Sequence, residues 1–363
     1  MLRRISDGTA SWLPGLALAA TLVTVTPVAG HHGVEAPESQ IQHGEWEVIS
    51  SPFADLWYHG LAVVGFHGLG LHPLYDVAYG RRIVRGNPDA PLSQVAPRVL
   101  ERLQADPAFE VLHFLPVYLA EASPEQALAG LRRIATSPGG EVPRLAGPGA
   151  RGTEALAALL PDPRQRQTLG ELVDALQSEW ESGLKETLSE ARASRADQLG
   201  RIRAHWQGYF APALAPYLEA YGLASGWIVA TPALGLEGRF LHGDDSGGQT
   251  VVVIGLGPSN DDPDAILAPV VRELCYPAVR RAFEQLQSRY DDRMVASRAS
   301  DAAATRCGEL LLERYRPEAL PSYRSRFGLQ GPHDSAFSSL PDPAEALVWN
   351  EALGRVLNLL GGS

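Results

Sequence analysis

The sequence predicts an α+β protein that is predominantly helical and contains a small antiparallel sheet. Most of the chain places apolar residues at helical spacing, often directly after a residue that favours a helix N-terminus. Two short runs, 226–231 and 250–254, are rich in β-branched residues and are typical of strands. No internal repeat or low-complexity tract is present, so the chain is expected to fold around ordinary hydrophobic cores.

The composition is that of a folded globular protein. The chain has 363 residues, of which 45% are hydrophobic and 20% are charged. Its net charge of -11 and the absence of a basic stripe argue against a nucleic-acid partner.

Residues 1–30 are predicted to be a signal peptide. Arg3 and Arg4 precede an apolar run at 13–25, and the small residues Ala29 and Gly30 follow it. The run is shorter than the roughly 20 residues that span a membrane. We therefore expect a periplasmic or secreted protein with no integral membrane segment after cleavage. The alternative is an uncleaved N-terminal anchor.

Residues 31–224 are predicted to form a helical region. A short strand at 46–50 is expected before its first helix. Ser123 is a favourable N-cap, and Pro124, which suits the first turn of a helix, follows it. The expected helices cover 54–66, 92–104, 109–122, 124–136, 169–199 and 212–223.

Residues 225–363 are predicted to contain the sheet and a central helix. The strands at 226–231, near 239–240 and at 250–254 fit an antiparallel arrangement, with a polar loop at 242–248. Helices are expected at 263–288, 302–315 and 343–360. The sheet immediately precedes the helix at 263–288.

The central helix has two different faces. At helical spacing, Arg272, Glu273, Tyr276 and Arg280 share a polar face, whereas Cys275 belongs to the apolar one. Pro277 removes a hydrogen bond to the carbonyl of Glu273 and is expected to bend the helix axis.

The stretch from Val271 to Pro277 (Val-Arg-Glu-Leu-Cys-Tyr-Pro) resembles the His-Glu-x-x-His-Pro motif of zincin-type metallopeptidases. The resemblance covers about residues 225–315 and implies a zincin-like C-terminal half. It makes Glu273 the candidate general base and Glu309 or Glu313 candidates for a third metal ligand. Both motif histidines are absent, since Arg272 and Tyr276 occupy their positions, and arginine offers no lone pair to a metal.

The resemblance therefore implies a metallopeptidase-like pseudoenzyme with a degenerate zinc motif. Such a protein would bind a peptide or protein through Arg272, Tyr276 and Arg280, and no cofactor is expected. We hypothesise that the Arg272 guanidinium takes the vacant cationic position and pairs with Glu273 or a later glutamate. One alternative is an active zinc peptidase that uses Glu273 as its base. Another is a structural or interaction domain in which these residues form a solvated helix face.

The two cysteines, Cys275 and Cys307, are a candidate disulfide because an exported protein meets an oxidising compartment. The alternative is a pair of buried free thiols.

Overall fold

A computed structural model describes residues 46–67, 73–119, 122–137, 160–242, 250–257, 262–284, 286, 293–329 and 343–358. These residues belong to one compact unit, His43–Ser363. The predicted signal peptide and residues 243–248 of the predicted polar loop lie outside the described residues. Within the described ranges, no helix is both long enough and apolar enough to cross a membrane.

The fold is mostly helical (74% helix) and belongs to an α+β-like class, with one mixed sheet of four strands. The strand order is β1-β2-β4-β3. The strands are β1 Trp46–Ile49, β2 Gly226–Thr231, β3 Arg239–Leu241 and β4 Thr250–Gly255. The sheet thus joins strands from both sides of the boundary predicted at residue 225, and that boundary stays a prediction.

The prediction of an antiparallel sheet is wrong for two of the three strand pairs. β1 pairs with β2, and β2 with β4, in parallel, and only β3 and β4 are antiparallel. The physical reason lies in burial: every residue of β4 is buried. A strand covered on both faces is an almost continuous apolar run, as is usual in parallel sheets.

The helices that follow β1 begin with α1. Ser51 caps α1, with its side chain accepting a hydrogen bond from the Ala54 N–H, and Gly65 ends it at a φ of 79°. Ser123 caps α5 in a reciprocal capping box with Gln126, as its sequence predicts. The elements are α1 Pro52–Val64, α2 Val77–Gly86, α3 Pro91–Ala105, the 3₁₀ helix η1 Pro107–Phe114, α4 Leu115–Tyr118 and α5 Pro124–Thr136.

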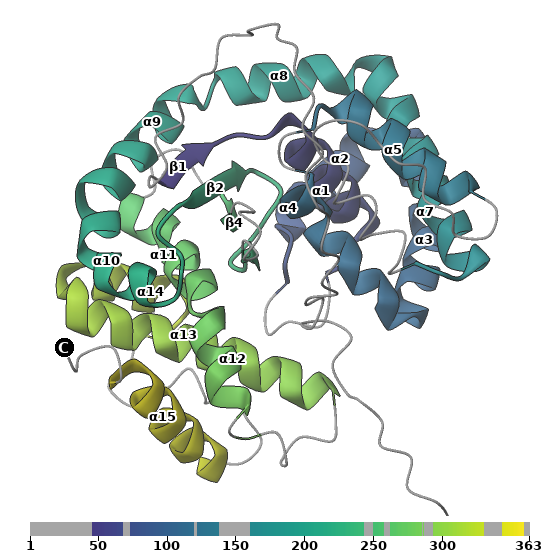
Figure 1. Cartoon of the computed structure of the whole chain (residues 1–363). Coiled ribbons are helices and arrows are strands. Elements are labelled where there is room, and N and C mark those ends of the chain that lie inside the picture. The colour runs from purple at the N-terminus through teal and green to yellow at the C-terminus, as the bar shows by residue number, and fades with distance from the viewer. Residues whose placement is uncertain are drawn as a thin grey trace, which may run out of the picture. The chain divides into compact units, whose positions relative to one another are not determined.

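Residues 163–220 form one nearly continuous helical segment that arches from the α1–α5 group to α10 (Figure 1). Two π-helical turns interrupt it, and Gly183 in the first has a φ of 126°. Such turns break the regular hydrogen-bond ladder and let a long helix change direction. The segment comprises α7 Pro163–Glu179, η3 Trp180–Leu184, α8 Lys185–Ala193, α9 Ala196–His205, η4 Trp206–Phe210 and α10 Ala211–Ala220.

The helices after β4 begin at Asp262, whose side chain caps α11. The single helix predicted at 263–288 is divided at Cys275, two residues before Pro277, whose nitrogen cannot donate to the Glu273 carbonyl. The elements are α11 Pro263–Leu274, α12 Tyr276–Glu284, α13 Arg293–Tyr315, the short 3₁₀ helix η6 Pro317–Ala319, α14 Leu320–Arg326 and α15 Pro343–Asn358.

Helices cover both faces of the sheet (Figure 1). Alternate strand residues point to opposite faces, and two separate hydrophobic cores result. Val48, Ile228 and Val252 pack with α9–α11 and α13. On the other face, Val229, Val251 and Val253 pack with α1, α3, α5 and α7.

Candidate functional site

Arg272 and Glu273 lie in the last turn of α11 and are both buried, with 1% of each residue exposed. The interpretation of this pair as part of a solvated helix face is therefore wrong. Loss of hydration is costly for charged groups, so two charges in this position require partners within the fold.

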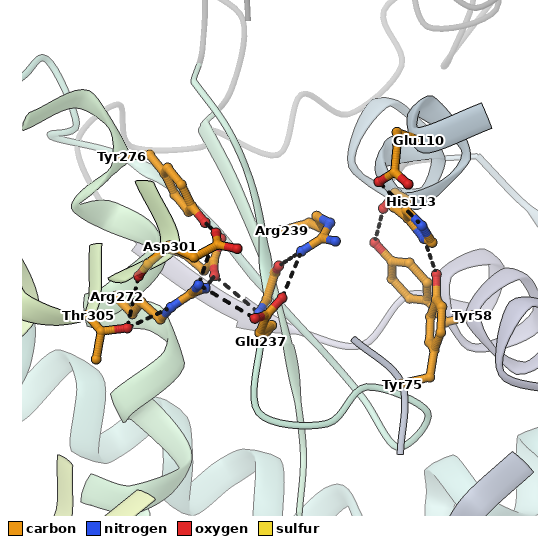
Figure 2. A network of polar contacts seen from close by, with 12 residues as sticks. Tyr58, Tyr75, Glu110, His113, Glu237, Arg239, Arg272, Tyr276, Asp301 and Thr305 are labelled. Atoms are coloured by element: carbon orange, nitrogen blue, oxygen red, sulfur yellow. Dashed lines mark hydrogen bonds and ion pairs between the residues drawn. The ribbon is translucent and has the colours of Figure 1, made fainter. Parts of the chain in front are cut away.

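The Arg272 guanidinium lies among three carboxylates (Figure 2). Its Nη1 donates to Glu273 Oε1 at 2.5 Å, and its Nη2 lies 3.2 Å from Asp301 Oδ1 and 3.8 Å from Glu237 Oε1. Its Nε donates to Thr305 Oγ1 at 3.2 Å. The hypothesised pairing of Arg272 with Glu273 is confirmed, and sequence reasoning missed Glu237 and Asp301.

The segment before β3 closes the other side of this network. The Gly238 N–H donates to Glu273 Oε1 at 3.1 Å, and Arg239 Nη1 lies 3.8 Å from Glu237 Oε2. A Cβ at Gly238 would lie 2.5 Å from the Val253 carbonyl oxygen and 2.8 Å from Glu273 Cγ, so the close approach of this segment to β4 and Glu273 requires glycine. The network thus contains three carboxylates and two guanidiniums.

The electrostatics follow from burial and this charge balance. Burial raises the pKa of Glu273, and the guanidiniums of Arg272 and Arg239 offset part of that effect. Burial likewise raises the pKa of Asp301. Burial alone would lower the pKa of Arg272, but Tyr276 and the carboxylates around it make the net shift strongly upward. Arg272 is therefore a permanent cation. The network has one carboxylate more than it has guanidiniums, and the raised pKa values of Glu273 and Asp301 favour a proton on one of these two acids.

Asp301 links the two positions where the resembling motif carries histidines. Its Oδ1 accepts a hydrogen bond from Tyr276 Oη at 2.6 Å and lies 3.2 Å from Arg272 Nη2. Positions 272 and 276 therefore converge on one carboxylate of α13, although the helix breaks between them. The only sequence signal for Asp301 is an acid in the alanine-rich stretch at 299–304.

The other predicted residues lie apart from this network. The side chain of Arg280 is 51% exposed and pairs with Glu284. Glu309 pairs with Arg306 and Arg324, and Glu313 also pairs with Arg324. Among the described residues, no group of three or more histidine, cysteine or acidic side chains is arranged to hold a metal.

Cys275 and Cys307 are brought together, as their predicted pairing requires, but in the structure they are free buried thiols. Burial raises the pKa of Cys275, and its hydrogen bond with Cys307 raises it further. A thiol with a raised pKa forms little of the reactive thiolate.

A chain that is exported to an oxidising compartment is expected to carry a Cys275–Cys307 disulfide, because the two thiols lie within hydrogen-bond reach of each other. Intact mass without reductant should be lower by two hydrogen atoms than the mass after reduction. Chain made in a reducing cytoplasm should keep both thiols and resist alkylation until it is unfolded. Rapid alkylation of the folded chain, or an unchanged mass after export, would contradict this.

A second polar cluster lies across from Arg239 and comes from α1, η1 and the segment before α2 (Figure 2). Tyr58 Oη donates to the His113 carbonyl oxygen at 2.9 Å, and Tyr75 Oη lies 2.7 Å from His113 Nδ1. Burial, and then the nearby Arg239 cation, hold the pKa of His113 well below its usual range. His113 is therefore neutral and fixes the two tyrosines.

Asp55 is a buried acid at the carboxyl ends of β1 and β2. It is 5% exposed, and neither its Oδ1 nor Thr231 Oγ1 makes a hydrogen bond of normal geometry among the described residues. Burial raises the pKa of Asp55 to about 6, although Thr231, Arg192 and Arg195 lower it. The adjacent cavity of ≈ 10 Å³ has room for about one water molecule.

No family model, curated protein or solved structure matches the chain. A functional interpretation therefore depends on the geometry of the chain's own residues.

Proposed function

We propose that the chain is an exported, zincin-like protein with a degenerate zinc motif, which binds a peptide or protein instead of catalysing hydrolysis. Export follows from the signal-peptide pattern of residues 1–30. The absence of catalysis follows from Arg272, which supplies a fixed positive charge where the motif calls for a metal ligand.

The observation that carries the proposal is the convergence of positions 272 and 276 on Asp301. In a metal site of this kind, side chains at i and i+4 and an acid from a later helix meet at one point. Here Arg272 and Tyr276 meet the Asp301 carboxylate, and Glu273 remains beside them. In the proposal, Asp301 therefore takes the place of the third metal ligand of the motif, for which Glu309 and Glu313 were the candidates.

The alternative of an active peptidase requires Glu273 to activate water. Its Oε1 already accepts from Gly238 N and Arg272 Nη1, and the residue is 1% exposed. A general base must reach the proton that it removes. The enclosed carboxylate of Glu273 favours binding over hydrolysis.

Restoring histidines at both positions tests the lost metal site. The variant Arg272→His/Tyr276→His, refolded with zinc and dialysed, is expected to hold one zinc ion per chain, because imidazoles would then face Asp301. Metal analysis checks the stoichiometry, and thermal unfolding with and without chelator checks coupling to folding. Adding Asp301→Ala should abolish tight binding.

Arg280→His is the matched control, because it adds a histidine to an exposed position of α12. It should bind no more zinc than the unsubstituted chain. A double variant that folds, as judged by circular dichroism, yet binds zinc no better than Arg280→His would overturn the zincin-like assignment. A double variant that fails to fold even with zinc would also count against it.

The edge strand β3 is the proposed site for the peptide. β3 pairs only with β4 among the described strands, and an extended peptide can add to such an edge through main-chain hydrogen bonds. Peptides selected from a random library should slow amide hydrogen exchange at 239–241. A selection that yields no binder, or peptides that protect only other segments, would contradict the binding role.

A further inference from the structure

A pocket of ≈ 350 Å³ lies between the C-terminal turn of α1 and the helix α2, away from the buried ion network. It is lined by Ala62, Val63, Gly65, His67, Val77, Gly80, Arg81, Val84 and Arg85. Its volume falls in the range of small-molecule sites.

The local backbone explains how the pocket forms. A Cβ at Gly80 would lie 2.4 Å from the Ala62 carbonyl oxygen, so the two helices are in contact at that point. Gly65 then ends α1 in the left-handed conformation. The described residues leave the space beside this contact open.

The wall of the pocket is apolar, and its rim is positively charged. Val77, Arg81 and Val84 lie on one face of α2 because they are spaced by three or four residues, and Arg85 follows Arg81 by one turn. Ala62 and Val63 are buried on the opposite side. The pocket can therefore hold an aliphatic group beside two guanidiniums.

The charge at the rim is uncompensated within the part of the chain that the structure describes. Arg81 and Arg85 are exposed, and no salt bridge joins either one to an acid among the described residues. No acid is among the described residues that line the pocket, although the whole chain has a net charge of -11. Two cations one helical turn apart repel each other, and an anion between them would remove that repulsion.

We propose that this pocket binds an aliphatic monocarboxylate, with its tail against Val77, Val84 and the end of α1, and its carboxylate between Arg81 and Arg85. Guanidiniums are well suited to carboxylates because of their matching planar geometry. At ~30 Å³ for each water-sized group, the pocket accommodates about a dozen non-hydrogen atoms, the size of decanoate. This site is independent of the proposed peptide site at β3.

Titration calorimetry of the full chain with decanoate, below its micelle concentration, tests the proposal. We expect saturable binding of one decanoate per chain. Arg81→Ser/Arg85→Ser should weaken it by at least about tenfold, since both charge-assisted contacts are lost. Decanol, which has the same tail without the charge, and decylammonium should bind at least about tenfold more weakly than decanoate.

Arg82→Ser is the control, because it removes one positive charge from the same helix, yet Arg82 lies over the Tyr79 ring and does not line the pocket. It should change the affinity by less than about twofold. Val84→Trp, which fills the space without changing the charge, should abolish binding. The proposal is overturned if decanoate does not bind, if Arg82→Ser weakens binding as much as the double variant, or if Val84→Trp leaves the affinity unchanged.

Discussion

Replacing Arg272 with methionine is expected to lower the free energy of unfolding by about 3–5 kcal/mol. Methionine matches the length of the arginine stem but leaves Glu273, Glu237 and Asp301 without the cation that they surround. Breaking a buried ion network by removing one partner costs more than the network contributes overall, because the remaining charges stay desolvated. Urea unfolding followed by circular dichroism measures the change.

Arg280→Met provides the comparison, since it makes the same chemical change two turns further on, at a side chain that is 51% exposed. Its ion pair with Glu284 is a solvated surface pair, so the expected loss is within about 0.5 kcal/mol. Losses of similar size in the two variants would mean that Arg272 is not the centre of a buried network. A loss below about 1 kcal/mol for Arg272→Met would lead to the same conclusion.

The part of this network that could be predicted from the sequence is local. Arg272 and Glu273 are adjacent in the sequence, and their pairing could be hypothesised from the resemblance of this stretch to the zinc motif. Asp301 and Glu237 reach the same guanidinium from α13 and from the segment before β3, and nothing in their own surroundings indicates this. The burial of Arg272 was likewise hidden, because a polar helix face usually indicates solvent.

The same distinction holds for the fold. Helices with strong local signals, such as α5 behind Ser123, were predicted to within a residue or two. The helix α2 was missed because two glycines, which are unfavourable in a helix interior, stand among its ten residues. Its N-cap, Asp76, and the helical spacing of its apolar residues were local signals that could have revealed it.

The strand directions could not be predicted from local pattern because they depend on distant partners. β1 pairs with β2, and Trp46 lies opposite Gly226 in that pair, far away in the sequence. β3 and β4 are joined by a short connection, which explains why the antiparallel prediction is correct for that pair alone. The run Val251–Ile254 does contain a signal for a doubly covered strand.

Replacing Asp55 with asparagine is expected to stabilise the protein at neutral pH, by at most about 3 kcal/mol. The pKa of Asp55 is raised from 3.8 to about 6 by burial. Between these two values the folded chain retains a proton that the unfolded chain releases, so stability falls as the pH rises through this window. Above about pH 6 the buried carboxylate of Asp55 is ionised, and the protein has lost the full amount of unfolding free energy that this charge costs. Asparagine has the same shape and never carries this charge.

The pH dependence distinguishes this effect from a general change in packing. Unfolding free energies of Asp55→Asn and the unsubstituted chain should differ little near pH 4, diverge up to about pH 6 and stay apart above it. Asp89→Asn, at an exposed position, should show no such divergence because that side chain remains solvated. A difference in unfolding free energy that is independent of pH, or a less stable variant at pH 7, would mean that the Asp55 charge is compensated in the fold.

The substitutions at Arg272 and Asp55 are expected to change the free energy of unfolding in opposite directions because the two buried charges are compensated differently. Arg272 is surrounded by opposite charges, whereas burial outweighs the compensation that Asp55 receives from Thr231, Arg192 and Arg195.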